Sequence, residues 1–148
     1  MAEEKKIRVG ITHGDTNGIG YEVILKTLSA PELAELCTPV LYGSTKIATY
    51  HRKALEMPGL NFNVLQDATG VKDGVNNFVD VIPEEVKVEL GHATKAAGEA
   101  AFKVLERAVA DLKAGKIDAL VTAPINKNTI QSEEFNFPGH TEYLEQAL

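Results

Sequence analysis

Three glycines and a carboxylate stand in one short segment, residues 14–20 (GDTNGIG), a composition that suits contact with a bound ligand. Glycine has no Cβ, so its backbone can approach a ligand closely at the entry to a helix. The glycine spacing is neither the dinucleotide fingerprint G-x-G-x-x-G nor a phosphate loop ending in Gly-Lys-Ser/Thr. Asp15 and Glu22 would also repel a phosphate there. We therefore expect Asp15, Gly18 and Gly20 either to form a ligand-facing loop or to make a tight turn whose aspartate holds backbone amides.

A second segment with chemical potential is residues 122–127 (TAPINK), which follows an apolar run and contains a rigid proline turn. Lys127 could bind a substrate anion or, with its pKa lowered by burial, transfer a proton. The alternative is a solvated lysine at the start of a helix. Lys127 is thus a candidate catalytic residue.

A third segment, residues 137–142 (FPGHTE), sets a histidine behind a Pro-Gly turn. His140 and Thr141 could both form hydrogen bonds to a ligand, because imidazole titrates near neutrality and a hydroxyl both donates and accepts. In the alternative interpretation Thr141 is only a helix N-cap and His140 a surface residue. We take His140 and Thr141 as candidate substrate-binding residues.

The remaining histidines and the cysteine offer little. His13, His51 and His92 stand among unrelated residues, and no histidine of the chain has a second one three or four positions away. Such spacing, or a converging set of ligands, is what a zinc-type centre commonly needs. Cys37 has no basic neighbour in sequence to activate it and reads as a small packing residue. The sequence therefore predicts no metal site within this chain.

The elements that must position these residues begin with a strand. Residues 7–12 (IRVGIT) are β-branched and apolar over the length of a buried strand. After Gly18 the apolar residues recur at helical spacing until Pro31, and we expect them near one face: Ile19, Val23 and Leu28. The first unit is a strand, a loop and a helix.

The same unit repeats along the chain. Residues 39–43 (PVLYG) predict a second short strand, and Ser44 is a plausible N-cap for a helix over residues 46–55. Residues 66–77 form a Gly- and Asn-rich segment that predicts a surface loop between strands. The apolar segments on either side of it are residues 62–65 and 78–82.

The clearest helix lies at residues 94–114. Its apolar positions repeat every three or four residues: Ala97, Ala101, Leu105, Ala108 and Leu112. Gly115 stands where a helix C-cap belongs. Residues 118–123 (DALVTA) then predict another buried strand, and a last helix begins near Thr141.

Strands that alternate with helices predict an α/β layered fold with a mainly parallel sheet and flanking helices. In such folds sites gather at the carboxyl ends of strands. Two loops qualify, residues 12–20 and 122–127. No internal repeat or clear linker divides the chain, so residues 1–148 are expected to be one unit.

Composition excludes several classes of protein. The chain has 21 acidic against 15 basic side chains and a net charge of -6, so its field repels nucleic acid and anionic membranes. No apolar run approaches the roughly 18 residues of a membrane span, and the first residues lack a secretory pattern. We expect a cytoplasmic protein with neither nucleic acid nor membrane as partner.

Taken together, the three segments resemble a known family. GITHGDTNGIGYEVILK, DALVTAPINKNTI and FPGHTEYL are similar to the GD-x-x-GIG, VTAPINK and GHTE signatures of 4-hydroxythreonine-4-phosphate dehydrogenases. GHATKAAGEAAFKVLERAV resembles the helix that precedes the middle signature. The order and spacing of the segments agree with the family over residues 7–148.

The resemblance implies a fold like that of isocitrate and isopropylmalate dehydrogenases, and a homodimer. It also implies NAD- or NADP-dependent, metal-assisted oxidation of 4-phosphooxy-L-threonine, followed by decarboxylation to 3-amino-2-oxopropyl phosphate, in pyridoxal phosphate (vitamin B6) biosynthesis. His140 and Thr141 correspond to substrate contacts, and Lys127 to a lysine close to the site. The histidines that hold the family's divalent ion (Zn, Mg or Co), and most cofactor contacts, fall in later segments that this chain lacks.

The chain also departs from the family. It has GDTNGIGYE where the family usually has GDPAGIGPE, so Thr16, Asn17 and Tyr21 replace two prolines and an alanine. Loss of proline puts the rigidity of the loop in question. Family chains are considerably longer, so we expect the N-terminal portion of a dehydrogenase, one truncated and incomplete α/β unit, inactive alone. The rival interpretations are a non-catalytic binding module and a related dehydrogenase or transferase that acts on another phosphorylated acid.

Overall fold

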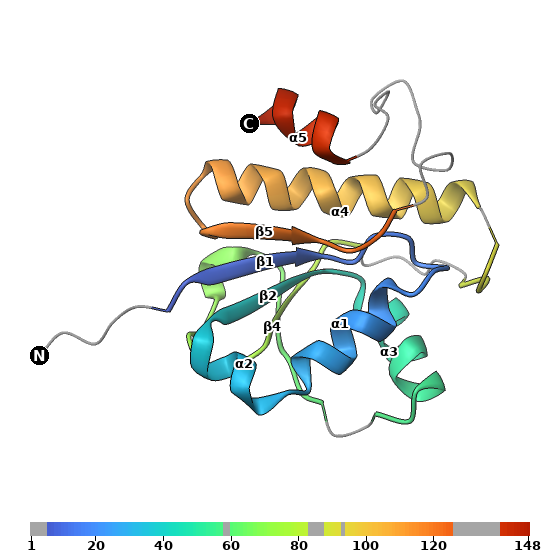
Figure 1. The fold of residues 1–148 in the computed structure, drawn as a ribbon, viewed down its shortest axis with the longest axis horizontal. Coiled ribbons are helices and arrows are strands. Elements are labelled where there is room, and N and C mark those ends of the chain that lie inside the picture. The colour runs from blue at the N-terminus through green and yellow to red at the C-terminus, as the bar shows by residue number, and fades with distance from the viewer. Residues whose placement is uncertain (1–5, 58–59, 83–87, 93, 126–139) are drawn as a thin grey trace, which may run out of the picture.

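The described part of the chain comprises residues 6–57, 60–82, 88–92, 94–125 and 140–148 of a computed structural model (Figure 1). Five strands are β1 (Arg8–Thr12), β2 (Thr38–Gly43), β3 (Asn63–Leu65), β4 (Asn77–Asp80) and β5 (Ala119–Thr122). The α-helices are α1 (Gly20–Leu28), α2 (Pro31–Leu36), α3 (Thr45–Ala54), α4 (Lys95–Lys113) and α5 (His140–Ala147), and Ala68–Gly70 form a short 3-10 helix, η1.

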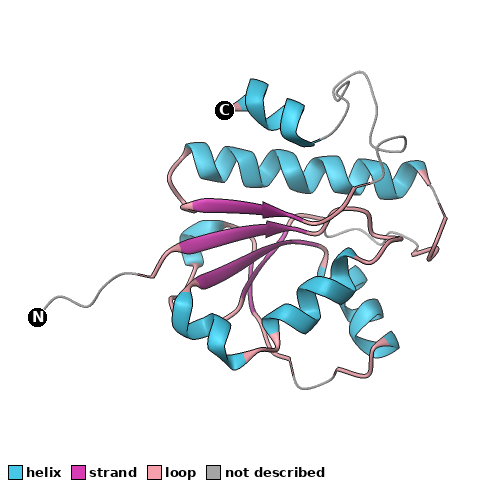
Figure 2. Ribbon diagram, in the orientation of Figure 1, coloured by secondary structure: helices cyan, strands magenta, loops and turns pink. Residues whose placement is uncertain are grey.

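The strands form one sheet in the order β3-β4-β2-β1-β5, and every neighbouring pair is parallel. The arrows in Figure 2 accordingly point the same way. Gly10 of β1 lies opposite Val40 on one side and Leu120 on the other. The predicted parallel α/β sheet with flanking helices is confirmed.

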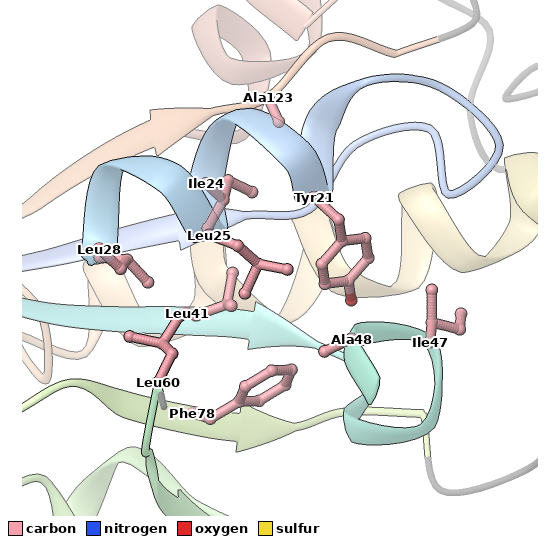
Figure 3. Close-up of a cluster of buried hydrophobic side chains, with 10 residues drawn as sticks. All are labelled: Tyr21, Ile24, Leu25, Leu28, Leu41, Ile47, Ala48, Leu60, Phe78 and Ala123. Atoms are coloured by element: carbon pink, nitrogen blue, oxygen red, sulfur yellow. The ribbon is translucent and has the colours of Figure 1, made fainter. Parts of the chain in front are cut away.

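Helices cover both faces of the sheet (Figure 1). On one face α1 and α3 enclose a core that also takes side chains from the sheet (Figure 3): Tyr21, Ile24, Leu25, Leu28, Leu41, Ile47, Ala48, Leu60, Phe78 and Ala123. On the other face α4 covers Val40, Tyr42 and Val79. The outer side of α4 in turn packs against α5. The result is a layered arrangement whose two cores share the central strands.

Helix α4 matches the predicted helix to within one residue at each end. Thr94 is the N-cap, its Oγ1 accepting a hydrogen bond from Ala97 N at 3.2 Å. Gly115 follows the helix with a φ of 78°, the left-handed value that glycine adopts without strain. The predicted apolar stripe is buried except for Leu112, which is partly buried. Ser44 likewise caps α3, accepting from Ile47 N at 3.3 Å, as predicted.

The predicted apolar face of α1 was wrong. Ile19 and Val23 are 60% and 50% exposed, whereas Leu28 is buried. Since a helix turns about 100° per residue, Leu28 lies almost opposite Ile19. The face toward the sheet is formed instead by Tyr21, Ile24, Leu25 and Leu28.

Two further expectations need correction. Pro31 does more than end α1, because it starts α2 at the first helical position, where its missing N–H costs nothing. The strand at residues 119–122 is not buried: β5 lies at one end of the strand order, and Val121 is 52% exposed.

The loop over residues 66–77 does join two strands as predicted, but it buries Ala68 completely against the α4 side of the sheet.

Candidate functional site

The carboxyl ends of β1 and β5 bring the two predicted loops together. From β1 the chain enters α1 on one face of the sheet, while α5, which follows β5, packs on α4 on the other face. Asp15 N donates to Pro124 O at 2.8 Å, and Ala123 N donates to Thr12 O at 3.1 Å. In open α/β sheets ligands bind outside the carboxyl ends where connections diverge to opposite faces. This edge is therefore the candidate site.

Asp15 holds the loop after β1 in a tight turn. Its Oδ1 accepts a hydrogen bond from Asn17 N at 3.1 Å, and its carbonyl accepts one from Gly18 N at 3.1 Å. This is the aspartate turn that the sequence allowed as one of two interpretations. Nearby Glu22 pairs with Lys26 at 2.9 Å along α1. The turn does not preclude a ligand-facing role, because Asp15 remains partly accessible.

The glycines of this loop differ in what they permit. Gly14 has a φ of 69°, and a Cβ there would collide with the carbonyl of Pro124. A Cβ on Gly20 would collide with the carbonyl of His13. At Gly18 the nearest atom to a Cβ would be Asp15 Oδ2 at 3.4 Å, an ordinary contact. The backbone therefore requires glycine at positions 14 and 20, whereas position 18 has room for a small side chain.

His13 is fully buried beneath the loop. Its Nε2 lies 3.4 Å from the carbonyl oxygen of Ala100, which can only accept, so Nε2 carries the proton. Nδ1 then accepts a hydrogen bond from the Tyr21 hydroxyl at 2.6 Å. Burial lowers the pKa of His13 from 6.5 to about 4, the carbonyl of Ala100 opposing and His51 assisting this shift. The imidazole is therefore neutral at pH 7 and links β1 to α1 and α4.

Tyr21 lies between two imidazoles. Its ring meets His13 edge-on with centroids 5.2 Å apart and stacks on His51 at 5.1 Å. Its hydroxyl also accepts from Ser44 N at 3.0 Å, and burial raises its pKa above the ordinary value. His51 Nε2 donates to Thr16 O at 3.1 Å, and desolvation lowers the pKa of His51. Both imidazoles thus stabilise the loop, His13 through Tyr21 and His51 through Tyr21 and the carbonyl of Thr16.

These contacts answer the question raised by the missing prolines. Thr16, Asn17 and Tyr21 have at most 2% of their surface exposed. Buried hydrogen bonds and ring contacts hold the loop in place of the ring constraint of proline. Sequence reasoning passed over His13 and His51 as isolated, and the one signal that pointed here was the departure from the family pattern at residues 16, 17 and 21.

The remaining predicted site residues are Lys127, His140 and Thr141. Lys127 is outside the described residues. His140 is the first residue of α5, but its side chain is also outside them, while Thr141 is exposed. The contacts of α5 run to α4, where the Tyr143 and Phe102 rings meet edge-on with centroids 5.9 Å apart. The structure thus brings together Asp15, Gly18 and Gly20 with residues 123–124, and does not test the roles of the other candidates.

The described residues at this edge form no metal centre. Among those residues no three His, Cys, Asp or Glu side chains gather to hold a metal ion. Hollows of about 530 and 240 Å³ lie along α3, both lined by Thr49 and Arg52, and neither is lined by a residue of the two loops. None of the described helices has the length and apolarity to cross a bilayer.

A parallel sheet with helices on both faces and a glycine-bounded loop at the diverging edge defines a class, the α/β enzymes whose sites lie at strand ends. Within that class the family can be stated. The profile described as pyridoxal phosphate biosynthetic protein PdxA matches residues 35–148. The chain belongs to this enzyme family.

Relatives and solved structures agree. The 4-hydroxythreonine-4-phosphate dehydrogenase of Bacteroides thetaiotaomicron is 56% identical over 146 residues, 99% of this chain and 40% of that protein. The D-threonate 4-phosphate dehydrogenase of Cupriavidus necator is 36% identical over 92% of this chain and 41% of its own length.

A crystal structure of a 4-hydroxythreonine-4-phosphate dehydrogenase from Burkholderia phymatum superposes with a TM-score of 0.84 at 30% identity, covering 98% of this chain and 44% of that one. The Klebsiella pneumoniae enzyme gives 0.81 at 26% identity, covering 97% and 44%. The chain therefore spans less than half the length of the proteins it matches.

Proposed function

We propose that the protein to which this chain belongs oxidises 4-phosphooxy-L-threonine (4-hydroxythreonine-4-phosphate) with NAD or NADP, in the formation of pyridoxal phosphate. The observation that carries the proposal is the 56% identity, over 99% of the chain, to the Bacteroides dehydrogenase of that name. The conserved fold supports it, since solved enzymes of the same name superpose over nearly all of this chain.

The proposed reaction has two steps. The carbon that bears the free hydroxyl transfers a hydride to the nicotinamide ring, and the hydroxyl proton leaves to solvent or a base. The product is a 3-oxo acid, which loses its carboxylate as carbon dioxide and takes up a proton to give 3-amino-2-oxopropyl phosphate. The cofactor supplies the electron sink, and the protein supplies position and electrostatics.

Within this chain we assign binding rather than redox roles. His140 and Thr141 are proposed to anchor the phosphate or carboxylate of the substrate by hydrogen bonds. The exposure of Thr141 near the start of α5 supports this assignment. Lys127 is proposed to hold a substrate anion or move a proton. Asp15, Gly18 and Gly20 belong to the loop proposed to line the site.

The cofactors are proposed from the family. A dehydrogenase needs a nicotinamide cofactor, and we propose NAD or NADP together with a divalent ion, Zn, Mg or Co. When bound, such an ion lowers the pKa of the substrate hydroxyl and polarises the ketone. The described residues supply no donor set for it. From the family resemblance we propose that the ion, and most of the cofactor, are bound by residues outside this chain.

We further propose that the protein is a cytoplasmic homodimer. Its binding partner is proposed to be a small phosphorylated acid, the substrate. The support is the resemblance to the family together with the net charge of -6, which disfavours polyanionic partners such as nucleic acid. Size-exclusion chromatography with light scattering of the gene product that contains this chain tests the dimer.

The test of the function is an assay of that gene product for NADH or NADPH formation with 4-phosphooxy-L-threonine and, separately, D-threonate 4-phosphate. The second substrate is included because the Cupriavidus relative, 36% identical, bears that name. Preferential turnover of 4-phosphooxy-L-threonine is expected. Preference for D-threonate 4-phosphate would transfer the assignment to that class, and turnover of neither would favour a non-catalytic binding module.

The 148-residue chain alone makes a sharp companion sample. We expect it to reduce no NAD and to hold no stoichiometric divalent ion, as measured by metal analysis and by calorimetric titration with zinc, cobalt and magnesium. A stoichiometric ion, or turnover by the chain alone, would show that the catalytic centre lies within these residues.

A further inference from the structure

Asn17, in the loop after β1, forms hydrogen bonds to the segment that leads from β4 into α4. Its Oδ1 accepts from Glu89 N at 2.7 Å, and its Nδ2 donates to His92 O and to Thr94 Oγ1, both at 3.1 Å. Its backbone carbonyl also accepts from Gly91 N at 2.9 Å. Asn17 is 2% exposed, and its side-chain bonds to Glu89, His92 and Thr94 are partly buried. Asn17 thereby joins two loops that are more than 70 residues apart in sequence.

The orientation of the Asn17 amide is fixed by its partners. An N–H of Glu89 can only donate, so it faces the amide oxygen, and a carbonyl of His92 can only accept, so it faces the NH2 group. An aspartate of nearly the same shape would keep the first bond. It would lose the bond to the His92 carbonyl, which would then face a carboxylate oxygen, while the Thr94 hydroxyl could donate to that oxygen instead. Asparagine and aspartate are therefore not equivalent here.

The described part of this segment, residues 88–92, packs only weakly against the core. Leu90 is 52% exposed, and Gly91 and His92 are exposed as well. Val88 is only partly buried against the α1 side. Loss of the Asn17 bonds should therefore move this segment more than it should weaken the sheet, because global stability depends mainly on buried apolar contacts.

The two loops lie at the edge where the site was located. The loop after β1 is also tied to the end of β5 through Asp15 N and Pro124 O. Thr94, one of the Asn17 partners, is the N-cap of α4, so the start of that helix is tied in as well. The connections after β1, β4 and β5 are thus linked through residues 15–17.

We propose that Asn17 is a positioning residue, which sets the loop preceding α4 against the loop after β1 so that both face the substrate at the carboxyl edge. The inference rests on the proposed function. Asn17 does not itself need to touch the substrate. It acts through the backbone of residues 89–92, whose place it fixes.

The test is Asn17→Asp in the gene product that contains this chain, with Asn61→Asp as the matched control. Asn61 is exposed, so its substitution adds the same charge without breaking a buried bond. At 25 °C kcat/KM of Asn17→Asp should fall by about tenfold or more, a factor that corresponds to losing the bond to the His92 carbonyl and placing a carboxylate oxygen against it. Hydrogen exchange of the Gly91 amide should accelerate while amides in the middle of α4 keep their protection. The control should match wild type in both measurements.

Asn17→Ser is the second variant, because its hydroxyl restores one donor and one acceptor in less space. Its kcat/KM should fall between wild type and Asn17→Asp, with thermal melting confirming that both variants are folded at the assay temperature. An unchanged kcat/KM in folded Asn17→Asp, or accelerated exchange spread over α4 as well, would overturn the inference. A wild type inactive on both phosphorylated substrates would overturn the proposed function instead.

Discussion

Acid should destabilise this fold through one buried imidazole. His13 is fully buried with its Nδ1 accepting from Tyr21 and its Nε2 facing the carbonyl of Ala100. A second proton would have to replace the bond from Tyr21 and would place a charge in the core. The pKa of His13 is accordingly lowered from 6.5 to about 4. We predict that the free energy of unfolding falls as the pH is lowered through this range.

The sign and size follow from proton linkage. Because the folded pKa lies below the unfolded one, the unfolded chain binds the proton first, and the contribution of neutral His13 is complete only above about pH 6.5. At about 1.4 kcal/mol per pKa unit, roughly 2 kcal/mol is lost between pH 7 and pH 5, and about 3 kcal/mol by pH 4. This is a large share of the stability of a small domain.

The assay is urea unfolding followed by circular dichroism, at intervals from pH 7 to pH 4, on wild type and His13→Gln. Glutamine keeps one acceptor and one donor but does not titrate. Between pH 7 and pH 4 the unfolding free energy of His13→Gln should therefore fall by about 3 kcal/mol less than that of wild type, each protein being compared with its own value at pH 7. Protonation of carboxylates affects both proteins and cancels in the difference.

The control is His92→Gln, which removes an exposed histidine. It should follow the wild-type profile. Parallel profiles for wild type and His13→Gln would refute the reasoning, because they would mean that the buried imidazole is charged in the folded state or that the region is open to water.

The other predictions concern backbone and ligand contacts. Glu56, the residue after the C-cap of α3, has a φ of 54°, so Glu56→Gly should stabilise the chain by about 1 kcal/mol. Gly115→Ala, at a φ of 78°, should destabilise it by a similar amount, and thermal melts should show shifts of opposite sign for the two variants. Gly20→Ala should cost about 1 to 3 kcal/mol by collision with a carbonyl, whereas Gly18→Ala should change the unfolding free energy by less than about 1 kcal/mol. Equal urea midpoints for these two variants would contradict the steric argument. His140→Ala in the whole gene product should lower kcat/KM by about 10- to 100-fold with an unchanged melting temperature, and unaltered kinetics would remove His140 from the site.

Local signals in the sequence predicted the elements well. The stripe and both ends of α4 were visible because a helix of 19 residues repeats its pattern several times, and because Thr94 and Gly115 act on their own neighbours. The N-cap at Ser44 is local in the same way.

Burial was harder to predict because it depends on neighbours far away in sequence. The 9 residues of α1 give few repeats of a helical stripe, and Ile19 and Val23 misled because apolar residues also occur on exposed faces. The apolar run at residues 118–123 suggested a buried strand, but β5 takes an end position in the strand order. No local pattern states a strand's position in the sheet.

The candidate site was predictable only in part. The turn at Asp15 was visible because its partners, Asn17 and Gly18, are two and three residues away. The roles of His13 and of Asn17 were not, because Ala100 lies 87 residues from the first and His92 lies 75 from the second. Side chains whose partners are distant carry no local signature.

The pairing of β1 with β5 has a consequence during synthesis. Val9 pairs with Pro39 on one side, but on the other side it pairs with Ala119, so β1 must wait for that strand. At about 5 to 20 residues per second, this side of β1 stays without its partner for roughly 5 to 20 s after it leaves the ribosome. During that interval its N–H and C=O groups can pair with any other extended segment. A ribosome that stalls between β4 and β5 would therefore hold a nascent chain in which β1 still has an open edge.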